Sequence, residues 1–95
     1  MAKVILYTSG FCHYCVQARR LLEAKGVVYD ELYIDRDPAL RAQMEGKTQR
    51  RSVPQIFIGD YHVGGYEDMR QLDKSGQLDA LLQGCFTNYN PTEVP

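Results

Sequence analysis

The spacing of apolar residues changes along the chain, and the changes predict eight secondary-structure elements. Four short, apolar and β-prone runs predict strands, at residues 3–8, 27–34, 55–58 and 61–63. Four segments with apolar residues at helical spacing predict helices, at residues 13–25, 38–46, 67–74 and 77–83. The predicted order is strand, helix, strand, helix, strand, strand, helix, helix.

Turn and cap residues support these boundaries. Asp37 followed by Pro38 is typical of a helix start, and Gly46 is expected to end that helix. Gly59 and Asp60 lie between two short strands, which predicts a hairpin. The short connections favour one α/β domain with a mixed sheet of about four strands flanked by helices. We expect the domain to cover residues 1–84 and a tail to cover residues 85–95.

Composition excludes several classes of protein. The chain has 95 residues, enough for one domain and too few for two. Its formal charge of −1 gives no general attraction to nucleic acid or to an anionic membrane. No apolar run approaches the roughly 18–20 residues of a membrane span, and the N-terminus lacks the apolar core of a signal peptide. We therefore expect a cytoplasmic protein.

The three cysteines include one C-x-x-C motif, Cys12 to Cys15, between a predicted strand and a predicted helix. Backbone N–H groups at a helix start stabilise a thiolate, which favours Cys12 as a nucleophile. Cys15, three residues on, is within reach of a disulfide and would resolve a mixed disulfide. The alternative is a zinc site, which would need further ligands from His13, His62 or Cys85.

Three separated segments resemble the dithiol glutaredoxins, most closely the small bacterial type. They are YTSGFCHYC at 7–15, RSVPQIFI at 51–58 and GGYED at 64–68. The resemblance covers the chain to about residue 84. It implies a thioredoxin-like fold and a glutathione-dependent thiol–disulfide oxidoreductase, with Cys12 as nucleophile and Cys15 as resolving thiol.

The resemblance also implies a glutathione site. Pro54 would follow a cis peptide bond and face the cysteines, and Val53 would pair with the backbone of the substrate. Asp68 would meet the α-ammonium of glutathione, and Arg50 or Arg51 would meet its glycyl carboxylate. The full set of expected contacts is Tyr14, Arg50, Ser52, Val53, Pro54, Gly65, Tyr66, Glu67 and Asp68. Taken alone, these residues read as an edge strand, a solvated basic loop and an acidic helix start.

His13 stands where the family usually has Pro. In this respect the chain resembles family variants that can hold a [2Fe–2S] cluster between two monomers with glutathione, so a cluster carrier with Cys12 as ligand is one alternative function. A thioredoxin-like electron donor for ribonucleotide reductase, reduced by a flavoprotein, is another. We expect a monomer whose partners are glutathione and disulfide-bonded or glutathionylated proteins, with ribonucleotide reductase among the candidates. We expect no nucleic-acid or membrane partner and no other metal, and we interpret Cys85 as an idle thiol.

Overall fold

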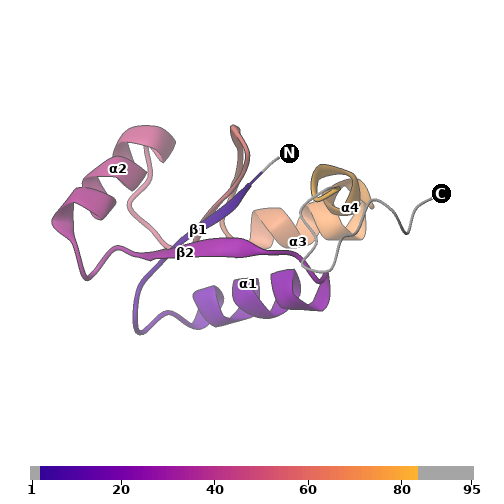
Figure 1. The fold of residues 1–95 in the computed structure, drawn as a ribbon, viewed down its shortest axis with the longest axis horizontal. Coiled ribbons are helices and arrows are strands. Elements are labelled where there is room, and N and C mark those ends of the chain that lie inside the picture. The colour runs from indigo at the N-terminus through magenta and orange to yellow at the C-terminus, as the bar shows by residue number, and fades with distance from the viewer. Residues whose placement is uncertain (1–2, 84–95) are drawn as a thin grey trace.

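The computed structural model describes residues 3–83 and contains all eight predicted elements (Figure 1). In chain order they are β1 (Val4–Thr8), α1 (His13–Ala24), β2 (Tyr29–Tyr33), α2 (Pro38–Thr48), β3 (Gln55–Ile58), β4 (Tyr61–Gly64), α3 (Tyr66–Lys74) and α4 (Gln77–Leu81). Within the described residues, no helix is long and apolar enough to cross a membrane. The predicted tail lies outside the described residues.

The strands form one mixed sheet in the order β2-β1-β3-β4. β1 pairs in parallel with β2, and α1 is the crossover helix that connects these two strands. β1 also pairs antiparallel with β3. β3 and β4 form the predicted hairpin, with an irregularity in register opposite Ile56 and Phe57. This arrangement confirms the expected four-stranded, thioredoxin-like α/β fold. It also places the end of β1 beside the start of β3, where Tyr7 lies opposite Gln55.

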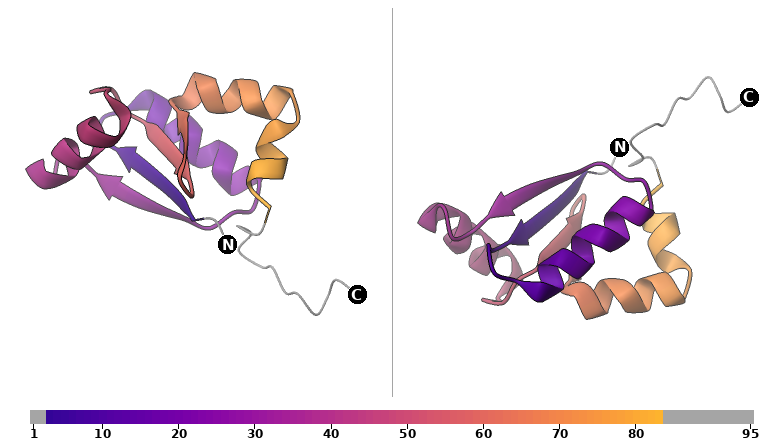
Figure 2. Two further views of the ribbon diagram at one scale, coloured as in Figure 1. Left: turned by 90° about the horizontal axis from the view of Figure 1, so that it is seen from above. Right: turned by 90° about the horizontal axis from the view of Figure 1, so that it is seen from below.

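Successive side chains of a strand point to opposite sides of the sheet. In the central strands β1 and β3, the side chains on both sides are largely buried. On one face, Leu6 and Ile56 pack with Leu22 of α1, Met69 of α3 and Leu78 of α4. The cluster of buried residues on the other face is smaller and lies under α2. Its buried residues are Tyr7, Ile34, Met44 and Phe57. The views in Figure 2 show the helices on the two sides of the sheet.

The second helix departs from the sequence-based expectation, because α2 does not end at Gly46 but continues to Thr48. The hydroxyl of Thr48 donates to the carbonyl of Met44 at 2.8 Å and keeps this last turn closed. The helix ends at Gln49, whose φ of 61° is left-handed. Glycine lowers helix stability but keeps its backbone N–H, so Gly46 alone does not stop the helix. Asp37 caps the start as expected, accepting from the N–H of Ala39 at 2.9 Å.

The position of Gly46 gives a prediction about stability. An added Cβ at this exposed position has no heavy atom within 4 Å. Gly46→Ala should therefore raise the free energy of unfolding by about 0.5–1 kcal/mol, since alanine has the higher helix propensity. Urea unfolding followed by circular dichroism measures the change.

Gly64→Ala is the matched control with the opposite sign. Gly64 has a φ of 111°, and an added Cβ would collide with the carboxylate of Asp68. This variant should unfold at lower urea concentration than the wild type. Equal effects of the two alanines would contradict both assignments.

Candidate active site

The C-x-x-C motif lies where the sequence placed it, at the start of α1. Cys12 is the N-cap residue, and its Sγ accepts a hydrogen bond from the N–H of Cys15 at 3.1 Å. The two cysteines form a disulfide, with their Cα atoms 5.1 Å apart. The preceding turn is held by Asp35, whose carboxylate accepts from the N–H of Gly10 at 2.9 Å. After reduction, the same N–H group and the helix dipole stabilise a thiolate at Cys12.

The two sulfur atoms differ in accessibility. Cys15 is fully buried against the sheet, whereas Cys12 is half-buried at the surface. Cys12 Sγ also lies 3.6 Å from the carbonyl oxygen of Val53, although the two residues are 41 positions apart. The peptide bond between Val53 and Pro54 is cis, as the resemblance implied. Of the two sulfur atoms, only that of Cys12 is accessible to a molecule from solvent, and it lies beside the Val53–Pro54 segment.

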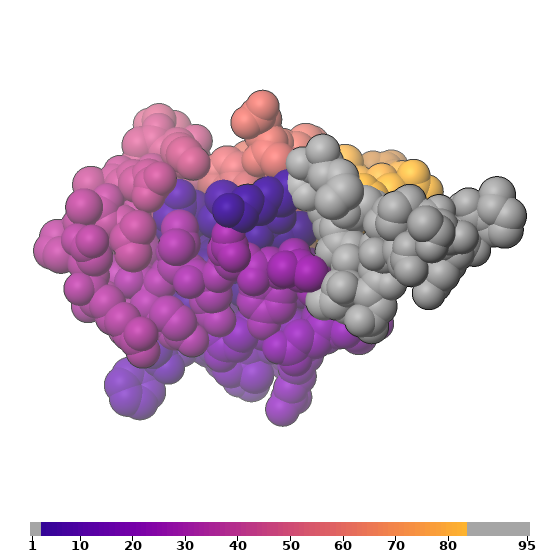
Figure 3. All heavy atoms as spheres, in the orientation of Figure 1, coloured from indigo at the N-terminus to yellow at the C-terminus, as the bar shows by residue number. Residues whose placement is uncertain are grey.

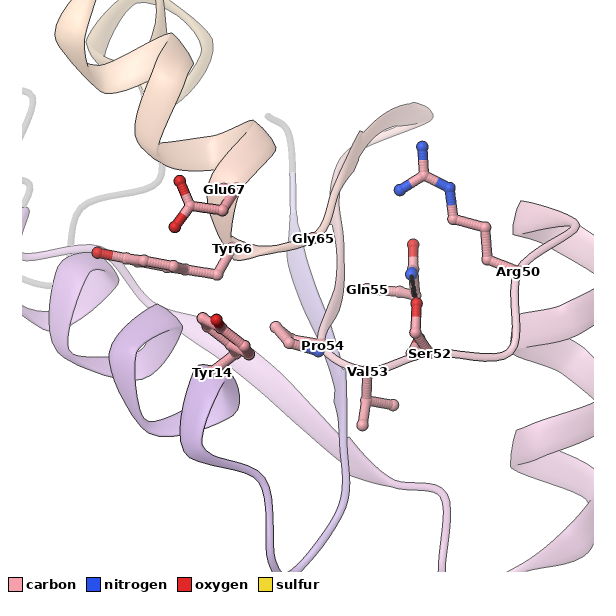
Figure 4. Close-up of a pocket in the computed structure, with 9 residues that line it drawn as sticks. All are labelled: Tyr14, Arg50, Ser52, Val53, Pro54, Gln55, Gly65, Tyr66 and Glu67. Atoms are coloured by element: carbon pink, nitrogen blue, oxygen red, sulfur yellow. Dashed lines mark hydrogen bonds between the residues drawn. The ribbon is translucent and has the colours of Figure 1, made fainter.

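A pocket of about 220 Å³ opens beside the Val53–Pro54 peptide bond (Figure 4). It is lined by the loop before β3, the first turn of α1 and the start of α3. The lining residues are Tyr14, Arg50, Ser52, Val53, Pro54, Gln55, Gly65, Tyr66 and Glu67. Eight of these nine belong to the set expected to contact glutathione, so the fold brings most of that set to one place. Arg51 is largely exposed and points elsewhere, with Nε 3.8 Å from the carboxylate of Glu45.

Gln55 is the lining residue that the sequence did not single out. It is fully buried, and it interrupts an otherwise apolar run at residues 53–58. A polar residue at a buried strand position needs a hydrogen-bond partner. The sequence shows a polar residue within an apolar run at this position, but it does not show which group forms the hydrogen bond with Gln55.

Asp68 was expected to face the ligand, yet it is not among the residues that line the pocket. Its Oδ2 accepts from the N–H of Gly65 at 2.9 Å and from the guanidinium of Arg50 at 3.3 Å. The bond from Gly65 is the main reason that the pKa of Asp68 lies below its usual value, and Arg50 lowers this pKa further. Asp68 therefore forms an ion pair with Arg50 at the rim of the pocket.

Aromatic side chains form the opposite end of the pocket. The rings of Tyr14 and Tyr66 stack with their centroids 6.3 Å apart and an angle of 26° between planes. Figure 4 shows them on one side of the cis peptide bond, with Arg50 on the other side. Phe11 is fully exposed, and its turn projects at the lower left of the surface in Figure 3. The surroundings of Cys12 are thus apolar on one side and charged on the other.

A polar network holds the first helix to the sheet. Glu31 of β2 accepts from the hydroxyl of Thr8 at 2.8 Å and from the guanidinium of Arg19 at 2.5 Å. Thr8 ends β1 and Arg19 lies in α1, so this one carboxylate connects three elements. The network fixes the helix that contains Cys15 and that Cys12 caps.

The described residues do not form a metal centre. Within residues 3–83, no three His, Cys, Asp or Glu side chains are grouped closely enough to hold a metal ion. A [2Fe–2S] cluster needs four protein or equivalent ligands. This part of the chain offers only Cys12 as an accessible sulfur, and that sulfur is bonded to Cys15. The expected cluster would lie between two monomers with glutathione, so these contacts of one chain do not test it, and this alternative stays a prediction.

The lowered pKa of Asp68 predicts how stability depends on pH. A carboxyl group with a lowered pKa in the folded state stabilises the protein above its unfolded pKa, and the effect is lost as pH falls through the folded pKa. Asp68→Asn should therefore reduce the free energy of unfolding at pH 7 and have a smaller effect near pH 2. Urea unfolding of both proteins from pH 2 to pH 7 tests this. A difference that stays constant over this range would contradict the assigned charge interaction.

Comparisons with known proteins agree with this geometry. The family model described as Glutaredoxin matches residues 4–63. A glutaredoxin of Pseudomonas aeruginosa is 46% identical over 82 residues, which is 86% of this chain and 98% of that protein. Glutaredoxin 3 of Escherichia coli is 47% identical over 83 residues, covering 87% of this chain and all (100%) of that protein.

Solved structures give the same result. The crystal structure of a buckwheat glutaredoxin–glutathione complex superposes with a TM-score of 0.83 at 25% identity, covering 90% of this chain and 83% of that one. The solution structure of a glutaredoxin from Brucella melitensis has a TM-score of 0.78 at 44% identity, covering 87% and 90%. With its Cys12–Cys15 disulfide at the helix start, this chain belongs to the glutaredoxin family of thiol–disulfide oxidoreductases.

Proposed function

We propose that this thiol–disulfide oxidoreductase uses glutathione as its reductant and acts on protein disulfides and protein–glutathione mixed disulfides. One observation carries the proposal. The accessible sulfur, Cys12 Sγ, lies 3.6 Å from the Val53 carbonyl, whose residue lines a pocket with charged groups at its rim. The solved buckwheat relative, which is a glutathione complex by description, supports the same ligand.

Glutathione is a tripeptide with one ammonium and two carboxylate groups, and the rim offers both charges. Asp68 uses Oδ2 for its contacts with Gly65 and Arg50. The ligand's α-ammonium would replace Arg50 at this carboxylate, and the released guanidinium would then bind a ligand carboxylate. The proposed glycyl carboxylate contact of Arg50 follows from this exchange. The Val53 backbone would pair with the ligand backbone, which brings the ligand sulfur to Cys12.

The chemistry is thiol–disulfide exchange. The Cys12 thiolate attacks the glutathionyl sulfur of a mixed disulfide, and the protein substrate leaves as a thiolate that takes up a proton. A second glutathione thiolate then attacks the Cys12–glutathione disulfide, which restores Cys12 and releases oxidised glutathione. With a protein disulfide, Cys12 forms a mixed disulfide and Cys15 displaces the substrate. Two glutathione molecules then reduce the Cys12–Cys15 bond.

The compartment and the protein substrates also belong to this proposal. A dithiol pair that cycles with glutathione suits the reducing cytoplasm. Phe11 and Tyr14 give an exposed apolar surface beside Cys12, which suits contact with a protein substrate. Ribonucleotide reductase remains a candidate among such substrates.

The unequal roles of the two cysteines predict unequal variants. Cys12→Ser should reduce turnover of a small glutathione mixed disulfide to the uncatalysed background. Cys15→Ser should keep this turnover and lose reduction of protein disulfides, because only the second reaction needs the resolving thiol. The assay supplies glutathione, glutathione reductase and NADPH, and follows NADPH consumption.

Cys85→Ser is the matched control, since this cysteine lies outside the described residues and is interpreted as idle. It should turn over both substrates like the wild type. Turnover that survives in Cys12→Ser would contradict the assignment of the nucleophile. A wild type that is reduced by thioredoxin reductase and not by glutathione would contradict the proposed reductant.

A further inference from the structure

Three polar residues form a continuous line of hydrogen bonds, which begins in the pocket wall at Ser52 and Gln55 and ends at His62. His62 of β4 lies with Nε2 2.8 Å from Oε1 of Gln55, the first residue of β3. Nε2 of Gln55 lies 3.0 Å from the carbonyl oxygen of Ser52 and 3.3 Å from its Oγ. We call these three residues the polar relay. Figure 4 shows its inner part, where Gln55 meets Ser52 next to the cis peptide bond.

The direction of each bond in the polar relay follows from its chemistry. A carbonyl oxygen can only accept, so the Gln55 group that faces Ser52 must be the amide NH₂. Oε1 of Gln55 therefore faces His62, and His62 must donate from Nε2. The Ser52 hydroxyl accepts from Gln55, which leaves its own hydrogen free to donate into the pocket.

We propose that His62 and Gln55 are positioning residues for substrate binding, because they hold Ser52 so that its hydroxyl faces a carboxylate of bound glutathione. The inference rests on the proposed use of glutathione. Ser52 and the cationic Arg50 line the same pocket two positions apart, so a carboxylate near Arg50 is within the region that Ser52 faces. Ser52 is also followed directly by Val53, whose carbonyl lies beside Cys12.

The surroundings of His62 suit a neutral donor. Burial and the nearby charge of Arg50 lower the pKa of His62, and Asp68 opposes this shift. A neutral imidazole carries one N–H, and the contact with Gln55 assigns it to Nε2. The ring also stacks on Phe57, with the centroids 4.8 Å apart and the planes 25° apart. A test must therefore separate the hydrogen bond from the packing.

Two substitutions make this separation. His62→Phe keeps a flat ring on Phe57 and removes the donor, whereas His62→Gln places an amide NH₂ near the position of Nε2. We expect His62→Phe to raise KM for a small glutathione mixed disulfide by on the order of three- to tenfold. This factor corresponds to the free energy that one hydrogen bond typically contributes to binding. kcat should change by less than about twofold, since the relay touches no reacting atom. His62→Gln should recover most of the wild-type KM.

The control is Tyr61→Phe, an adjacent and exposed position of β4 outside the relay. It should leave KM and kcat unchanged, and urea unfolding of all variants identifies any loss of folded protein. The donor also has a direct signature. Long-range ¹H–¹⁵N correlation spectra of the wild type at pH 7.5 should show His62 as the Nε2–H tautomer.

The outcomes are distinct. A raised KM in His62→Phe, recovery in His62→Gln and the Nε2–H tautomer would support the relay. The Nδ1–H tautomer, or His62→Phe with the wild-type KM, would overturn it. Failure of the proposed function has a different result, because the wild type itself would then not turn over the glutathione mixed disulfide.

Discussion

The antiparallel pairing of β1 with β3 is the constraint on which the site depends. β1 leads directly into the turn that carries Cys12, and β3 begins directly after Pro54. Because Tyr7 lies opposite Gln55 in this pairing, two segments far apart in the chain meet at one edge of the sheet. The 3.6 Å contact between Cys12 Sγ and the Val53 carbonyl is a consequence of that register. A slip of one strand by one residue would move its side chains to the opposite faces of the sheet and displace the two segments relative to each other.

The register is held by burial on both faces. Leu6 and Ile56 face α1 and α3, whereas Tyr7 and Phe57 face α2. Both faces of each central strand are therefore packed against helices. Glu31 adds a polar connection, because it accepts from both Thr8 and Arg19 and so joins β1, β2 and α1. The sulfur of Cys12 is thereby placed on a well-packed support, while the neighbouring side chains of Phe11 and Tyr14 are exposed.

The charged pair at the rim of the pocket is partly exposed to solvent, unlike the buried strands of the sheet. Arg50 and Asp68 are each about half exposed and pair at 3.3 Å, so their attraction is screened by water and readily exchanged for ligand charges. Asp68 is oriented by the N–H of Gly65, and the left-handed Gly64 leaves room for its carboxylate. The charged groups are thus positioned by backbone geometry and stay exposed, as the proposed binding of glutathione requires. The polar relay adds a directional element beside Arg50, centred on the buried Gln55.

Most of the elements, the C-x-x-C motif at a helix start and the family resemblance could be determined from the sequence alone. These features depend on local periodicity, cap residues and short segments, which a single chain displays directly. The extension of α2 past Gly46 could not be determined, because it depends on the Thr48 hydroxyl closing the last turn. Nor could the Arg50–Asp68 pair or the Gln55–His62 contact, since each joins residues from different segments of the fold. Tertiary structure decided the Arg50–Asp68 and Gln55–His62 contacts because hydrogen bonds and ion pairs act over a few ångströms, and only the fold sets which distant side chains come that close.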